Sequence, residues 1–220
     1  LASAPVVDED GRLTGMITVD DMVDVIQEEN KEDLLALSGV NEGGATQSVL
    51  DAVKSRAPWL AVNLFTAFIV SGVISMFETA LSQIVTLAVL MPVVAALGGN
   101  AGSQALAVTV RAIAERDLVG PSVSRAIRRE LFTAVLNGLI FALGVGLIAF
   151  VWFGDPQLAG VISVAMLATF VWAGLTGVLV PLALQRLGAD PAVASSVFVL
   201  TSVDVAGFFA FLGLASLVLL

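Results

Sequence analysis

Long runs of apolar residues, separated by short polar stretches, fill the chain from residue 57 to its end. A helix needs about 20 mainly apolar residues to cross the hydrocarbon core of a bilayer. The pattern therefore predicts an all-α polytopic membrane protein with five transmembrane helices. The second, fourth and fifth are long enough to tilt or to extend beyond the hydrocarbon. We place the spans at residues 57–77, 83–110, 131–153, 158–185 and 192–219.

A small β-β-α unit is predicted before the membrane part. Residues 4–19 read as two short strands joined by a turn at Asp10-Gly11, a dipeptide that tight hairpins favour. Asp20 and Asp21 then cap a helix. The helical period places Asp21, Asp24 and Glu28 together on the face opposite its apolar residues.

Residues 29–56 form a polar, partly helical connector that is broken near Gly39 and at Gly43-Gly44. Glu29, Glu32 and Asp33 are spaced i, i+3 and i+4, so they project from one helical face. Taken alone, such a run of charges is a solvated helix face.

The composition sharpens this picture. Hydrophobic residues make up 58% of the chain and charged residues 13%, with a mean hydropathy of +0.98; soluble domains carry about twice that charged fraction. Of the 19 acidic residues, 12 lie in residues 1–51, which favours a cation-binding surface there and argues against nucleic acid as a partner. The sequence has no cysteine and no histidine. Any metal ion would therefore be held by oxygen atoms, which suits Mg²⁺ or Ca²⁺.

Basic residues predict the orientation in the membrane. Four of the ten precede the first span, five lie between the second and third, and one lies between the fourth and fifth. The other two loops and the C-terminus have none. Because cytoplasmic loops carry the excess of Lys and Arg, we expect a cytoplasmic N-terminus and, with an odd number of spans, an outside C-terminus.

Asp204 is the most informative residue of the membrane part. It lies near the middle of the fifth span, where a charge costs at least a few kcal/mol, so we expect it to face an ion path. The alternative is a buried carboxyl that is protonated or bonded to a neighbouring helix. Thr201 and Gly207 share its stripe at i+3 spacing, and Phe208 and Phe211 extend that side as a possible apolar constriction.

The second span is unusual for a lipid-facing helix. Pro92 removes a backbone hydrogen bond, while Gly98 and Gly102 either admit another helix closely or leave carbonyl groups open to a water-filled path. Asn100 and Gln104 lie one turn apart on the same face. These carboxamides favour a polar lining.

Three motifs together resemble the MgtE family of magnesium channels and transporters. The segment V-V-D-x-D-G-x-L-x-G-x-I-T-x-x-D from Val6 resembles the second half of a CBS motif, so we expect the chain to begin inside a regulatory domain. The second span contains P-x5-G-G-N-x-G-x-Q and the fifth contains T-x-x-D-x-x-G. The resemblance covers essentially the whole chain, in the family's order.

This resemblance implies a homodimer in the cell membrane, with a Mg²⁺ pore on the two-fold axis lined by Asn100, Gln104, Thr201 and Gly207 around Asp204. It also implies that Mg²⁺ regulates the pore from the cytoplasm. The implied sensing residues are Asp21, Asp24, Glu29, Glu32 and Asp33. The implied domains are a CBS remnant at 1–28, a plug helix at 29–56 and a pore domain at 57–220. One departure is Val197, where the family commonly has proline.

Other classes of function fit the sequence less well. A proton- or Na⁺-coupled transporter could use Asp204 as a relay, but a relay usually employs several carboxylates and the predicted spans contain one. An intramembrane enzyme would lack His, Cys and a second carboxylate within the spans, so we expect no enzymatic activity. A purely structural bundle would not need Asp204.

Overall fold

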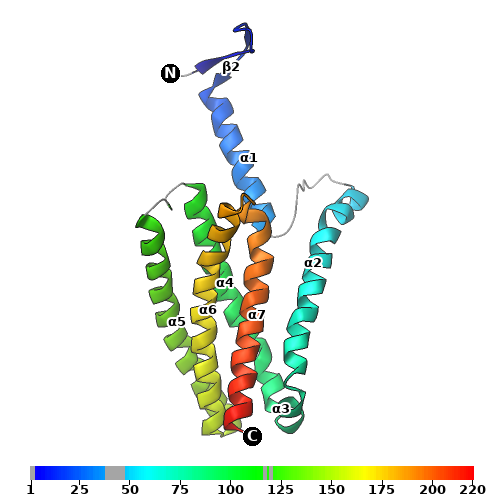
Figure 1. Cartoon of the computed structure of the whole chain (residues 1–220), viewed down its shortest axis with the longest axis vertical. Helices are drawn as coiled ribbons and strands as arrows, with labels where there is room; N and C mark the ends of the chain where they lie inside the picture. Colours follow the sequence, from blue (N-terminus) through cyan, green and yellow to red (C-terminus); the bar gives the residue numbers. More distant parts are fainter. Residues whose placement is uncertain (1–2, 38–47, 116–117, 119–120) are drawn as a thin grey trace.

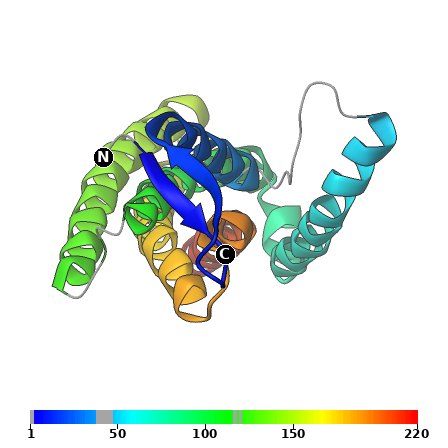
Figure 2. The same ribbon diagram turned by 90° about the horizontal axis from the view of Figure 1, so that it is seen from above.

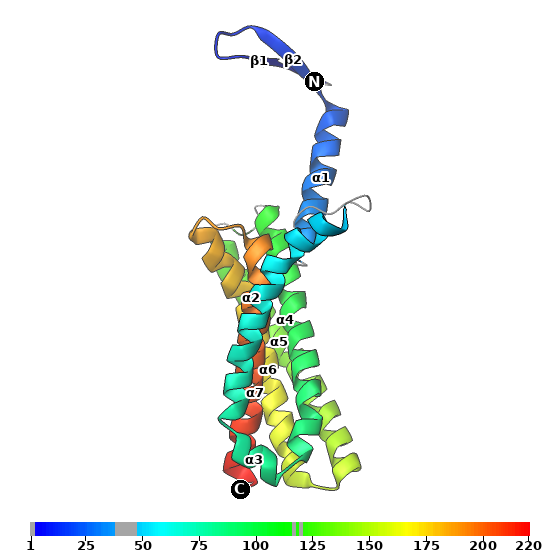
Figure 3. The ribbon, with the colours of Figure 1, turned by 90° about the vertical axis from the view of Figure 1, so that its right-hand side faces the viewer.

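Five long helices stand side by side in a bundle, and a hairpin followed by one more helix projects from one end of it (Figures 1 and 3). This computed structural model describes the backbone of residues 3–37, 48–115, 118 and 121–220. The elements in chain order are β1 (Ser3–Val7), β2 (Leu13–Thr18), α1 (Val19–Leu37), α2 (Val49–Ser75), α3 (Glu78–Gln83), α4 (Thr86–Ala114), α5 (Pro121–Phe153), α6 (Pro156–Arg186) and α7 (Pro191–Val218).

The prediction of five spanning helices is confirmed. Helices α2, α4, α5, α6 and α7 are each long and apolar enough to cross a membrane. The predicted third span, residues 131–153, lies within α5, but this helix begins ten residues earlier, at Pro121. Charged residues near the end of a span can extend their long side chains to water. A helix can therefore include such residues without ending at them.

The N-terminal β-β-α unit is also present. β1 and β2 pair antiparallel, and Gly11 takes a φ of 76° in the turn, a conformation that glycine adopts without steric cost. Thr18 and Asp21 then start α1 with reciprocal hydrogen bonds. The Thr18 amide donates to Asp21 Oδ2 over 2.8 Å, and the Asp21 amide donates to Thr18 Oγ1 over 3.3 Å. This is the capping box that begins many helices.

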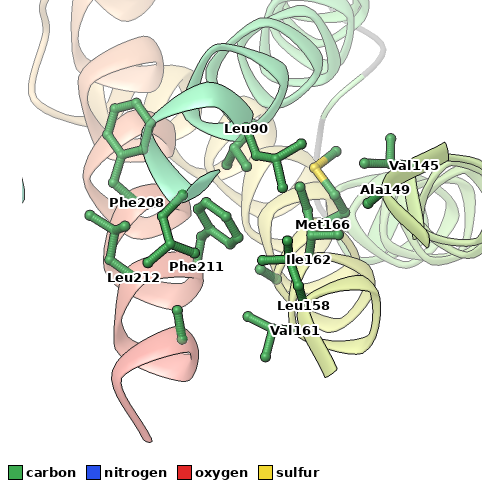
Figure 4. Packing of buried hydrophobic residues seen from close by; sticks show 14 of the residues in the cluster. Leu90, Val145, Ala149, Leu158, Val161, Ile162, Met166, Phe208, Phe211 and Leu212 are labelled. Carbon is green, nitrogen blue, oxygen red and sulfur yellow. The ribbon is translucent and has the colours of Figure 1, made fainter. Parts of the chain in front are cut away.

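Helix α6 is the centre of the bundle, since it packs against α4, α5 and α7. α2 and α5 lie on opposite sides of this group (Figure 2). Figure 4 shows the main apolar core, where Phe211 of α7, Leu90 of α4 and Met166 of α6 converge. Half of the apolar window of α6 is buried inside the chain, compared with none of that of α2.

Glycines set how closely the central helices approach. A Cβ added at Gly98 of α4 would lie 2.6 Å from Thr169 Cγ2 of α6 and 3.0 Å from Val203 Cγ1 of α7. A Cβ added at Gly177 of α6 would lie 2.5 Å from Ala105 Cβ of α4. Of the two readings that the sequence left open for Gly98 and Gly102, the structure supports close helix packing.

Candidate functional site

Asp204 is the one ionisable residue of α7, and its side chain is half-buried. The preceding residue, Val203, packs between Gly98 and Gly102 of α4, which fixes the rotation of α7 at this level. Within the part of the chain that the structure describes, the Asp204 carboxylate has no hydrogen bond and no ion pair. The carboxylate is therefore available to a ligand at the partly open side of α7.

The rest of the predicted α7 stripe divides into two groups. Thr201 is half-buried like Asp204, and its hydroxyl donates to the carbonyl of Val197 over 2.7 Å. Gly207 is buried instead, against Thr169 of α6 and Val94 of α4, so in this chain it serves helix packing.

The idea of a constriction formed by Phe208 and Phe211 does not agree with the structure. Their exposed fractions are 7% and 0%, and both side chains belong to the apolar core. Large aromatic side chains gain most when they are removed from solvent, and the clustered apolar residues of α4 and α6 provide that environment.

Asn100 and Gln104 lie on a different side of α4 from Gly98. They line a cavity of about 410 Å³ between α4, α5 and α6, and neither Asp204 nor Thr201 is among its lining residues. The structure thus brings the two carboxamides together with each other but not with Asp204. The spacing from Gly98 to Asn100 is a signal for this, because residues two apart point about 200° apart on a helix.

Glu130 of α5 is a residue that the sequence reasoning missed. It is half-buried and lines the same cavity as Asn100 and Gln104, with Asn137 one further residue of that wall. The late start assigned to the third span had placed Glu130 in a loop. Glu130 was assigned to a loop because it follows Arg128 and Arg129, and such clusters of charged residues are typical of loops at the membrane surface.

The predicted cytoplasmic sensing residues lie on α1. Asp21 and Asp24 are exposed. The pKa of Asp21 is lowered, first by the hydrogen bond from the Thr18 hydroxyl and then by that from the Thr18 amide. One Asp21 oxygen thus has a structural role as a helix cap. The side chains of Glu29, Glu32 and Asp33 lie outside those that the structure describes.

Among the described residues, no three carboxylates gather into a cluster that could hold a metal ion. Helices α4 to α7 contain two acidic residues, Glu130 of α5 and Asp204 of α7, and only Glu130 lines the cavity between α4, α5 and α6.

Comparisons with known proteins identify the family of the chain. Residues 91–214 match the MgtE family, described as a divalent cation transporter, and residues 1–28 match the CBS domain. The magnesium transporter MgtE of Enterococcus faecalis is 36% identical over 215 residues, which cover 98% of this chain and 48% of that protein. The proteins of the same name from Bacillus subtilis and Thermus thermophilus are 34% and 36% identical over 96% and 98% of this chain, and 47% and 48% of their own lengths.

The chain thus spans about half the length of the curated relatives it matches. The family match covers more than half of the chain and includes most of α4 and most of α7, with Asp204. The chain is a multi-pass membrane protein that belongs to the MgtE family of divalent cation transporters.

Proposed function

We propose that the chain is the membrane part of a Mg²⁺-selective channel, in which two copies pair and hydrated Mg²⁺ crosses beside Asp204 on the two-fold axis. The observation that carries this proposal is the half-buried Asp204 carboxylate, which no described residue of the chain pairs. The relatives, each named a magnesium transporter, support Mg²⁺ as the transported ion.

Two carboxylates across an axis would make a better ion site than one. They repel each other when the site is empty, so they favour a divalent cation between them. Mg²⁺ gives up its water reluctantly and is usually bound with several waters in place. Asp204 would therefore hold the hydrated ion through water, and the Thr201 hydroxyl, whose proton is engaged by Val197, would accept a hydrogen bond from that water.

Regulation by cytoplasmic Mg²⁺ forms a second part of the proposal. α1 packs against α7, so the helix that bears Asp21 and Asp24 touches the helix that bears Asp204. Mg²⁺ bound at the acidic face of α1, extended by Glu29, Glu32 and Asp33, would hold α1 against the pore and keep it closed. Patch recordings of the ion current across cytoplasmic Mg²⁺ concentrations, on a chain extended to the full length of its relatives, test this part.

The central experiment compares Asp204→Asn with Asp190→Asn in proteoliposomes, with Mg²⁺ flux as the readout. Both changes remove one negative charge from α7 or its cap, and asparagine keeps the cap that Asp190 provides to the Ala192 amide. We expect Asp204→Asn to lower flux at least about ten-fold, because each 1.4 kcal/mol of lost ion binding is a factor of ten. Asp190→Asn should keep its flux; wild-type flux from Asp204→Asn would refute the pore assignment.

Glu130 supports the alternative of a proton- or Na⁺-coupled transporter. It is a second acidic residue, besides Asp204, in a helix that is long and apolar enough to cross a membrane. It lines a cavity that Asp204 does not reach, so the two carboxylates do not form a continuous relay in one chain. Mg²⁺ flux measured with and without an imposed pH or Na⁺ gradient separates the two functions. Flux that a gradient drives uphill would favour the coupled transporter.

A further inference from the structure

A polar groove lies between α4 and α5, which both pack against α6. Its cavity has a volume of about 410 Å³, and α6 contributes the buried residues Phe170 and Gly174 to the lining. Asn100, Gln104 and Thr133 line the same cavity but are exposed within the chain. The groove therefore opens toward the surrounding membrane, so a ligand can enter it from the side.

The charged end of this groove lies at the level of the lipid headgroups. A helix rises about 1.5 Å per residue, so about 20 residues of α5 cross the hydrocarbon core. Trp152, near the end of α5, is suited to one membrane surface. About 20 residues before Trp152 the helix reaches Phe132, which marks the other edge of the hydrocarbon. Arg129 and Glu130 thus lie among the headgroups, and Asn137 lies within the hydrocarbon.

Both signs of charge are present at this end of the groove. Arg129 and Glu130 line the cavity together, and within the described part of the chain neither forms an ion pair. Both also line an adjoining cavity of about 210 Å³, to which Arg125 contributes a second guanidinium group. Arg125 and Arg129 are one helical turn apart, so both can approach the same anionic group. Guanidinium groups bind phosphate well, because two N–H donors meet two oxygens.

The deeper part of the groove offers hydrogen-bond donors. The carboxamides of Asn100, Gln104 and Asn137 line it and have no hydrogen-bond partner among the described residues. Polar groups at membrane depth cost free energy unless they face water, a ligand or each other. The ester carbonyl oxygens of a phospholipid lie just below its phosphate and can only accept hydrogen bonds, so they match these N–H groups.

We propose that this groove binds a phosphatidylethanolamine lipid, with its phosphate at Arg129 and Arg125 and its ammonium group at Glu130. A lipid with a net negative charge would also meet the guanidinium groups, but the Glu130 carboxylate would repel it. Phosphatidylcholine carries the same two charges, but its trimethylated ammonium has no N–H to donate to Glu130. The side-by-side Arg129 and Glu130 therefore favour the zwitterionic lipid whose cation can donate hydrogen bonds.

The test is a lipid titration of the whole chain, purified in detergent and stripped of lipid. Bound lipids are counted by native mass spectrometry with phosphatidylethanolamine, phosphatidylcholine or phosphatidylglycerol added. We expect one phosphatidylethanolamine per chain, bound at least about ten-fold more tightly than phosphatidylcholine. A hydrogen bond to a charged group contributes enough free energy for a factor of about ten or more in affinity.

Variants locate the site. Glu130→Gln should abolish the preference for phosphatidylethanolamine over phosphatidylcholine, and Arg129→Gln should weaken binding of both about ten-fold, because each loses its phosphate contact. Arg128→Gln is the matched control, since Arg128 is exposed, precedes Arg129 directly and lines neither cavity. It removes the same charge and should change neither the preference nor the affinity.

Four results would overturn the proposal. Equal binding of phosphatidylethanolamine and phosphatidylcholine by the wild-type chain would do so, and this result depends on no variant. Tighter binding of phosphatidylglycerol would show a site for anionic lipids instead. Equal weakening by Arg128→Gln and Arg129→Gln would show unspecific attraction to a basic surface. Absence of saturable lipid binding would show that lipid does not occupy the groove, as when a second copy of the chain covers it. Mg²⁺ flux is not part of the readout, so the test is independent of the pore assignment.

Discussion

Replacing Gly177 with alanine tests a close contact between α6 and α4. The added Cβ would lie 2.5 Å from Ala105 Cβ, 3.0 Å from the Leu106 nitrogen and 3.1 Å from the Gly102 carbonyl oxygen. Carbon atoms in good contact are about 3.5–4.0 Å apart, so α6 and α4 must separate by about 1 Å. Two of the three neighbours are backbone atoms, which cannot move aside by changing rotamer.

The magnitude follows from two opposing effects. Overpacking a well-packed site costs about 1–3 kcal/mol, while alanine gains up to about 1 kcal/mol over glycine in a helix. We expect Gly177→Ala to lower the free energy of unfolding by about 1–2 kcal/mol. Gly160→Ala in the same helix meets no atom within 4 Å and should be neutral or stabilising.

The assay is denaturant or thermal unfolding in one detergent, followed by fluorescence of the three tryptophans. Combining Gly177→Ala with Ala105→Gly removes the shortest contact but leaves the two backbone contacts. A double-mutant cycle should therefore give a favourable coupling of about 1 kcal/mol and only partial recovery. Equal stability of Gly177→Ala and Gly160→Ala, or a coupling of zero, would refute the close approach of α4 and α6.

Three further changes test other contacts. Asp155→Ala should cost about 1 kcal/mol of unfolding free energy, because its carboxylate caps α6 by accepting from two backbone amides, and Asp155→Asn should recover most of it. Trp172→Phe removes the 2.9 Å hydrogen bond to Ser202 between α6 and α7 and should cost about 0.6 kcal/mol in the same assay. The lowered pKa of Asp21 means that its charged form stabilises the start of α1 above the ordinary aspartate pKa, and that this is lost as the pH falls through the lowered value. Amide exchange in the first turn of α1 should accelerate over that pH range in the wild-type chain and show no such step in Asp21→Asn.

The spans were predictable because apolar length is a local property of the sequence, and the hairpin was predictable from its Asp10-Gly11 turn. The rotation of each helix was not, since it depends on which neighbours fill its grooves. Gly98 and Gly102 receive Thr169, Val199 and Val203, and this packing turns Asn100 away from Asp204 and toward α5. The two-residue offset between the glycines and the carboxamides does predict that these residues lie on different sides of α4, because residues two apart point about 200° apart on a helix.

Glu130 illustrates the opposite difficulty. Its local sequence, R-R-E at residues 128–130, is typical of a loop at the membrane surface. The structure shows instead that these three residues belong to α5. The backbone hydrogen bonds of a helix are satisfied internally, so charged residues do not end it unless turn chemistry intervenes. Here Pro121, which is well suited to a first helical position, marks the start instead.

The peripheral position of α2 has a consequence for how the protein is made. None of the side chains of α2 is buried within the chain, and it packs mainly against α7, which is synthesised after α4, α5 and α6. During translation α2 must therefore reside in the bilayer as a single helix, held by its own apolarity, while α4, α5 and α6 are still being added. Exchanging α2 for an unrelated apolar helix of equal length should leave assembly of the α4–α7 core intact, so the first span acts in biogenesis as an independent anchor.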